Sequence, residues 1–179
     1  IGHRLVAAGL LPRHIDYSNH KLGGIEDICF LTPELITAYR PVCLDLGGIA
    51  KGFAVDMAVK ILISEGISSG IVNAGGDLRV FGNHPKCVCI RNPKSPSQLI
   101  EIGKLQNAAI ATSGLYFANR DQAVSHLINP LATDDAEIHL QATGSYSVVA
   151  KECIYADALT KVLAISKQFN HPCFAQFSA

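Results

Sequence analysis

Four polar or glycine-rich segments interrupt an otherwise apolar sequence and carry the residues that could do chemistry. They are residues 45–52, 73–77, 112–116 with 125–130, and 156–160. Each segment lies at the edge of a predicted strand or helix, where binding sites are usually built. Each also has an ordinary structural explanation: Asp45 could cap a turn, Lys51 could be solvated, and Gly75-Gly76 could form a hairpin turn.

The segment at residues 45–52 predicts a phosphate site. Residues 42–46 are expected to form a strand and residues 50–66 a helix, so Gly47-Gly48 becomes a strand-to-helix turn. The free backbone N–H groups and the dipole at the start of a helix attract anions. The ammonium of Lys51 adds a positive charge at the same place.

The order and spacing of the motifs LDLGGIAKGFAVD, IVNAGGDLRVFG, IATSGLY, SHLINP and VVAKECIYADAL closely resemble the ApbE family, the FAD:protein FMN transferases. The resemblance covers roughly residues 42–165, and the first motif is the most distinctive. It implies an α+β flavin-binding fold and a magnesium-dependent reaction. In that reaction FMN passes from FAD to a threonine hydroxyl of an acceptor protein, and AMP leaves. Some relatives instead hydrolyse FAD to FMN and AMP.

The resemblance also implies a role for each motif. His126 would take the proton of the acceptor hydroxyl, although a structural role for this histidine fits as well. Asp157 and the backbone carbonyl of Gly48 would hold Mg²⁺, which prefers oxygen ligands and would neutralise the phosphate under attack. The positions that would contact FAD or line its cleft are Asp45, Lys51, Asn73, Gly75, Gly76, Thr112, Ser113 and Ile128.

This sequence departs from the ApbE pattern in ways that favour a second interpretation. The family places a metal-binding threonine four residues after the aspartate, where this chain has Lys161. Thr160 would point about 100° away on a helix and is no simple replacement. Asn129 replaces the usual aspartate, and most of the family's N-terminal portion is absent. A non-catalytic flavin- or nucleotide-binding relative is therefore the alternative to the transferase.

Other chemistries are less well supported by the sequence. A P-loop would need a further glycine upstream and a Ser or Thr after Lys51. A hydrolase triad of Ser113, His126 and Asp157 lacks the Gly-x-Ser-x-Gly elbow. Zinc could bind His84 with the Cys87-Val88-Cys89 pair, but we expect all six cysteines of the chain to be buried, reduced thiols.

Composition limits the classes of protein to which the chain can belong. The chain has 179 residues, a formal net charge of +0, 49% hydrophobic residues and 17% charged residues. This balance predicts one globular domain over residues 1–179 without an electrostatic patch for nucleic acid. No apolar run is long enough to span a membrane. The chain begins without Met, so we expect its natural N-terminus to be missing. Family resemblance places the protein on the periplasmic side of a bacterial inner membrane.

The expected elements fit an α+β fold, because strands and helices do not alternate regularly. A partial helix and short strands are expected in residues 1–40. On the helix at 50–66, apolar residues at helical spacing include Phe53, Met57 and Ile61, whereas Asp56 is expected on the other side. A second helix is expected over 156–166. The remaining predicted strands are residues 70–74, 77–81, 87–90, 108–112, 146–150 and 174–177.

Overall fold

The computed structural model of the chain describes residues 2–13, 21–114, 127–130, 132 and 144–179. His126 and Tyr116 lie outside these described residues. Within them the fold is mixed helix and sheet, as the sequence predicts.

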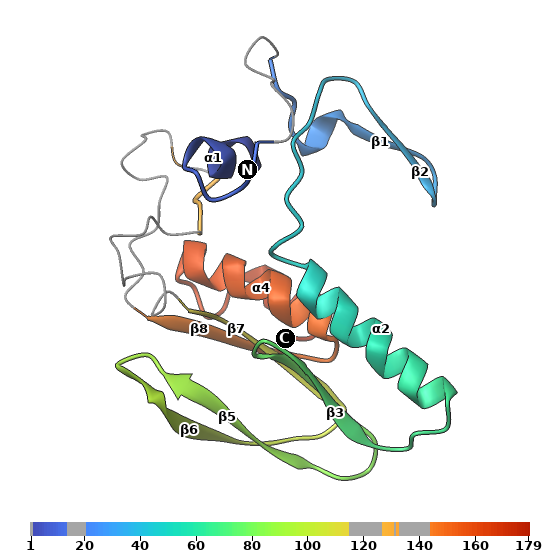
Figure 1. The fold of residues 1–179 in the computed structure, drawn as a ribbon, viewed down its shortest axis with the longest axis vertical. Helices are drawn as coiled ribbons and strands as arrows, with labels where there is room; N and C mark the ends of the chain where they lie inside the picture. Colours follow the sequence, from blue (N-terminus) through green and yellow to red (C-terminus); the bar gives the residue numbers. More distant parts are fainter. Residues whose placement is uncertain (1, 14–20, 115–126, 131, 133–143) are drawn as a thin grey trace.

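An antiparallel four-stranded sheet in the order β3-β4-β7-β8 forms the centre of the fold (Figure 1). Its strands are β3 (Gly70–Ala74), β4 (Asp77–Phe81), β7 (Ala108–Gly114) and β8 (Ser145–Ala150). All four predicted strands are therefore confirmed. Between β4 and β7 the chain forms a separate hairpin of β5 (Lys86–Asn92) and β6 (Ser95–Leu105), of which only β5 was predicted.

Both faces of the central sheet are covered. Helices α2 (Ala50–Ser64) and α4 (Cys153–Ser166) lie on one face, and the β5–β6 hairpin lies on the other (Figure 1). Successive residues of a strand point to opposite faces. Accordingly, Ala109 and Ala111 of β7 pack in the core beneath the helices, and Ile110 packs in the core beneath the hairpin. The short apolar runs of the sequence reflect this burial on both sides.

Helix α2 buries a different face from the one its apolar residues predict. The buried residues are Gly52, Val55, Asp56 and Val59, whereas Phe53 and Ile61 are 54% and 57% exposed. The expectation that Asp56 lies away from the core is wrong. This helix is apolar on nearly every side, so periodicity alone could not select the face that packs.

Helix α4 matches its prediction better. Leu159 and Leu163 are buried with Val148 and Phe174, and Val162 packs against them. The helix begins three residues earlier than predicted, at Cys153.

Two local predictions are wrong. Residues 41–46 have no regular secondary structure and pair with no strand among the described residues, so the predicted strand at 42–46 is absent. The predicted strand at 174–177 is instead part of helix α5 (Pro172–Gln176). Local interactions favour a helix start here. Pro172 has the fixed φ of a first helical turn, and the His171 ring accepts a hydrogen bond from the Cys173 N–H.

The N-terminal part lies at the edge of these layers. It contains α1 (Gly2–Ala7), the 3₁₀ turn η1 (Ile25–Asp27) and a hairpin of β1 (Ile28–Thr32) and β2 (Leu35–Ala38) (Figure 1). Arg40 pairs with Asp27 at 2.8 Å and ties the hairpin's base together. None of the described helices has the length and apolar character needed to cross a bilayer.

All six cysteines are thiols and not disulfides, but the expectation that they are buried is wrong for most of them. Only Cys153 is buried, and Cys87 and Cys89 are exposed on the outer side of β5. The zinc alternative also gains no support, because His84, Cys87 and Cys89 form no metal-binding group in the described part of the chain.

Candidate functional site

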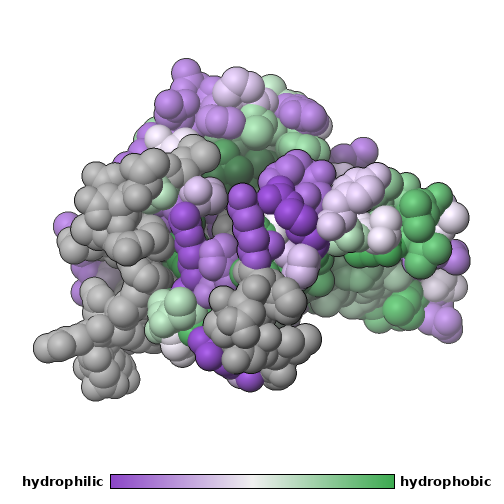
Figure 2. Space-filling model, turned by 90° about the horizontal axis from the view of Figure 1, so that it is seen from above, coloured by the Kyte–Doolittle hydropathy of each residue, from purple (hydrophilic) through white to green (hydrophobic). Residues whose placement is uncertain are grey.

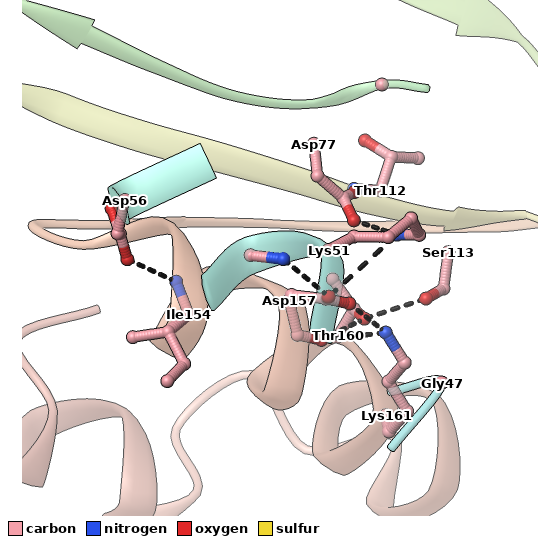
Figure 3. Close-up of polar contacts among 12 residues, drawn as sticks. Gly47, Lys51, Asp56, Asp77, Thr112, Ser113, Ile154, Asp157, Thr160 and Lys161 are labelled. Carbon is pink, nitrogen blue, oxygen red and sulfur yellow. Dashed lines mark hydrogen bonds and ion pairs between the residues drawn. The ribbon is translucent and has the colours of Figure 1, made fainter. Parts of the chain in front are cut away.

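Helices α2 and α4 cross at their first turns, and each supplies a carboxylate to the start of the other (Figure 3). Asp56 of α2 accepts hydrogen bonds from the N–H groups of Cys153 at 3.0 Å and Ile154 at 2.8 Å. Asp157 of α4 accepts one from the Gly52 N–H at 3.1 Å. A Cβ at Gly52 would overlap the Cys153 carbonyl, so only glycine permits this crossing.

Asp157 is fully buried and receives a donor at every oxygen. Its Oδ1 forms an ion pair with the Lys161 ammonium, and its Oδ2 accepts from Gly52 and lies 3.8 Å from the Lys51 ammonium. Its backbone oxygen accepts hydrogen bonds from Lys161 at 2.9 Å and from the Thr160 hydroxyl at 2.7 Å. A buried carboxylate with these partners is held in one orientation.

Lys51 connects α2 to the sheet. Its ammonium pairs with Asp77 on β4, and Asp77 also accepts a hydrogen bond from the Thr112 N–H on β7 (Figure 3). Burial lowers the pKa of Lys51 despite the attraction of Asp157, and the nearby positive charge of Lys161 lowers it further. The Lys51 side chain nevertheless remains 50% exposed, so its ammonium can meet a ligand.

Lys161 lies between the glycine turn and Asp157. A Cβ at Gly48 would lie 3.3 Å from Lys161 Cε, so the lysine stem passes directly over this glycine. The Lys161 side chain is 24% exposed. Two lysines from different helices therefore share one buried carboxylate and reach towards the surface.

A pocket of about 310 Å³ opens beside Lys161. Its lining includes Asp45, Gly47, Gly48 and Lys161 together with apolar side chains. The apolar lining residues are Leu5, Leu10, Leu11, Leu127, Ile128 and Ile165. Seen from above, hydrophilic surface gathers at the centre of this face beside a recessed apolar patch (Figure 2). A ligand with an apolar part and an anionic part would match this pocket.

The glycine turn does not bind anions in the way that the sequence predicts. The N–H groups of Ile49 and Ala50 both donate to the Leu46 carbonyl, at 3.0 and 2.9 Å. The Gly52 N–H donates to Asp157. The prediction of free N–H groups is therefore wrong at these three positions. Asp45 is exposed, and its side chain accepts a hydrogen bond from the Gly47 N–H at 2.9 Å. This is the turn-capping role that its position in the sequence suggests.

The second glycine motif forms the β3–β4 turn. Asn73 Oδ1 accepts a hydrogen bond from the Gly76 N–H at 2.9 Å, and Gly75 and Gly76 have φ of 65° and 104°. Glycine adopts this left-handed backbone at little cost. The turn leads directly into Asp77, so it helps position the partner of Lys51. Contact of these residues with a cofactor stays a prediction.

The side chains of Thr112 and Ser113, in the β7 motif, point to opposite faces of the sheet. The Thr112 hydroxyl bonds to Ser147 at 2.8 Å and points away from Asp157, and only its N–H serves the site (Figure 3). The Ser113 hydroxyl bonds to Thr160 at 2.7 Å. Thr160 is fully buried in this contact. Ser113 is also occupied by this bond, which gives no support to a hydrolase triad.

The residues proposed for magnesium do not fit that ion in this arrangement. A metal ligand must offer a free lone pair, and an ammonium offers none. Here the Lys161 ammonium bonds to the Asp157 carboxylate and backbone oxygen, and its stem covers Gly48. The described residues also contain no cluster of three or more His, Cys, Asp or Glu side chains suited to a metal.

Sequence reasoning missed Asp56, Arg79 and the packing role of Gly52. Arg79 on β4 pairs with Asp56 at 2.6 Å and fixes the carboxylate that holds the start of α4. The sequence signal that could have indicated the helix crossing is the spacing of Gly52 and Asp56, four residues apart in one helix. The same spacing relates Cys153 and Asp157 in the other.

Comparison with known proteins identifies the family. The ApbE family profile matches residues 7–176. The chain is 33% identical over 153 residues to the FAD:protein FMN transferase of Vibrio cholerae, covering 79% of this chain and 44% of that protein. It is 31% identical over 149 residues to the FAD:protein FMN transferase of Rhodobacter capsulatus, covering 79% of this chain and 28% of that protein.

Solved structures agree. The ApbE protein of Thermotoga maritima superposes with a TM-score of 0.65 at 26% identity, over 87% of this chain and 52% of its own. The apo flavinyl transferase ApbE of Pseudomonas stutzeri gives a TM-score of 0.63 at 25% identity, over 79% and 44%. The chain thus spans about half the length of these structures or less. Profile, sequence and fold together show that this chain belongs to the ApbE family.

Proposed function

We propose that this protein is an FAD:protein FMN transferase. It would transfer FMN from FAD to a threonine of an acceptor protein and release AMP. The observation that carries the proposal is the pair of lysines, Lys51 and Lys161, held by the buried Asp157 beside a mostly apolar pocket. FAD combines an apolar ring system with an anionic diphosphate, and this site offers a complement to each part.

The pocket residues would bind the two parts of FAD differently. Leu5, Leu10 and Ile128 would contact the apolar rings, and the lysines would hold the diphosphate by charge-assisted hydrogen bonds. Asp45, which also lines the pocket, would accept hydrogen bonds from ligand hydroxyl or N–H groups. Asp157 would act through the lysines by holding them in place.

The transfer would be a substitution at the phosphorus atom of the FMN half. The threonine oxygen forms a new P–O bond, the P–O bond to the AMP phosphate breaks, and AMP leaves with that electron pair. Lys51 and Lys161 would stabilise the negative charge that develops on the leaving phosphate. We assign His126 to take the hydroxyl proton, on sequence resemblance alone. The magnesium dependence of the family is left out of this proposal, because Gly48 and Asp157 do not fit the ion.

The second candidate is a flavin- or nucleotide-binding protein without transferase activity. The Lys161–Asp157 pair favours it, because it engages the carboxylate to which the resemblance assigns a metal. An FAD pyrophosphatase is a variant of the first candidate, with water in place of the threonine. By resemblance we place either activity on the periplasmic side of a bacterial inner membrane.

One assay separates these candidates. The full chain is incubated with FAD, with and without a threonine-containing acceptor peptide, and AMP, FMN and flavinylated peptide are measured. AMP together with flavinylated peptide supports the transferase, and AMP with free FMN supports the pyrophosphatase. Bound FAD without AMP supports the binding protein. Lys60→Met, on the exposed side of α2, is the control for loss of a lysine outside the pocket.

A further inference from the structure

We propose that the Lys161 ammonium takes the place of a divalent cation, so that this chain binds the diphosphate of FAD without magnesium. The inference rests on the proposed FAD ligand but concerns how its charge is neutralised. It begins from one observation: Lys161 bonds to both the carboxylate and the backbone oxygen of Asp157.

The geometry assigns Lys161 a fixed place. Its stem packs over Gly48, and its ammonium is anchored at two oxygens of the residue one helical turn earlier. A lysine free in solvent loses side-chain entropy when a ligand orders it. Lys161 has already lost much of that freedom, so it is preorganised to present its charge.

The charges around Asp157 leave little reason for a metal to bind. The Lys51 and Lys161 ammonium groups both interact with this carboxylate, and a second carboxylate, Asp77, pairs with Lys51. Each of these carboxylates therefore already has an ammonium partner. A divalent cation at the same oxygens would have to displace Lys161 and would be repelled by both lysines.

The same ammonium can also reach the ligand. Lys161 lines the pocket, and its side chain keeps an exposed fraction of 24%. An ammonium has three N–H donors, so one or more can face a phosphate oxygen while others remain on Asp157. The backbone N–H groups of Ile49, Ala50 and Gly52 have partners within the protein, so the lysines must carry more of the anion's charge.

The first test needs no FAD. Mn²⁺, a magnesium substitute visible by electron paramagnetic resonance, is titrated into the full chain and into Lys161→Thr, with Lys60→Met as the control. We expect no specific Mn²⁺ binding by the wild-type chain or the control. Lys161→Thr should bind one Mn²⁺ per chain, because Asp157 is freed and a hydroxyl is added. Specific Mn²⁺ binding by the wild-type chain would overturn the inference, as would its absence in a folded Lys161→Thr.

The second test measures FAD affinity by flavin fluorescence in excess EDTA and in excess magnesium. The wild-type affinity should be the same in both, and Lys161→Met should weaken it roughly tenfold or more in both, as loss of a hydrogen bond to a charged group does. Lys161→Thr should be weak in EDTA and recover with magnesium. FAD binding by the wild-type chain only with magnesium would refute the inference and leave the transferase proposal standing. No FAD binding under either condition would refute the transferase proposal, and the Mn²⁺ titration would still decide the role of Lys161.

Discussion

Two buried aspartates occupy equivalent places in the crossing of α2 and α4 but have different neighbours. Asp56 holds the start of α4 and pairs with Arg79, whose side chain is 18% exposed. Asp157 holds the start of α2 and pairs with two lysines whose side chains are 50% and 24% exposed. Arg79 lines a pocket of about 430 Å³ near the end of α2, whereas Lys161 lines the pocket beside the glycine turn, which also contains the motif residues Asp45 and Gly48.

The comparison shows that the same arrangement, a buried aspartate that accepts hydrogen bonds from the start of the other helix, can serve stability in one place and ligand binding in the other. A guanidinium has a planar set of donors that is well suited to a fixed, enclosed carboxylate. An ammonium on a flexible stem can keep its carboxylate and still meet a ligand. We therefore expect the Asp56 side to determine stability and the Asp157 side to determine ligand binding.

Asp56→Ala should have the largest effect on stability. It removes the acceptor for Cys153 and Ile154 and leaves the Arg79 guanidinium without its partner, which should cost about 4 kcal/mol. The measurement is the free energy of unfolding in urea. Asp45→Ala is the matched control, because its exposed carboxylate caps only a turn and should cost about 1 kcal/mol or less. Equal losses in the two variants would contradict the structural role of Asp56.

Gly52→Ala should follow, with a loss of about 3 kcal/mol. The added methyl group would overlap the Cys153 carbonyl and force the two helices apart, which weakens both reciprocal caps. Gly144→Ala is the control, because a Cβ there meets no atom of the described residues within 4 Å. Urea unfolding of both variants checks this, and a Gly52→Ala variant as stable as Gly144→Ala would refute the close crossing.

Asp157→Ala should reverse the balance between stability and binding. Although its carboxylate is fully buried, its loss should cost only about 2 kcal/mol, because both ammonium groups can turn to solvent. FAD affinity, however, should fall further than in Asp56→Ala, because both lysines lose their anchor. Fluorescence titration with FAD, at temperatures where both variants are folded, makes the comparison. A larger binding loss in Asp56→Ala would contradict the division of roles.

The smallest effect should come from Cys153, which lies between the two aspartates. Burial, together with the Asp56 and Asp157 carboxylates, raises the pKa of its thiol from 9.0 to about 12. Between these values the unfolded chain loses the proton and the folded chain keeps it, so stability falls as pH rises. Cys153→Ala should remove this part of the alkaline decline. Unfolding free energies across the alkaline range, compared with Cys89→Ala on the exposed strand, provide the check.

Much of the fold could be predicted from local sequence patterns. Alternating and continuous apolar runs predicted the four strands of the central sheet, and helical spacing predicted α2 and α4. These patterns succeed because a strand or helix of normal length carries its periodicity in its own residues. Strand β6 was missed because its residues from 97 to 102 are exposed and its pairing with β5 carries little apolar signal.

The candidate site was only partly predictable. The motifs brought Asp45, Gly48, Ile128 and the residues next to Asp157 to attention, and the structure places them around one pocket or at its base. Thr112 failed as a side-chain contact because the register of β7 turns its hydroxyl to Ser147, on the other face of the sheet. Register is a property of paired strands, so one strand's sequence does not determine it.

The sequence by itself determined the order of the motifs, most of the helices and strands that carry them, and the presence of Lys161 in place of a threonine. Only the tertiary structure decided that α2 buries Gly52 and Asp56, and that Lys161 pairs with Asp157. The physical reason is that each of these outcomes depends on a partner from another element. Close contact between two helices and the sharing of one buried carboxylate arise only when the chain has folded.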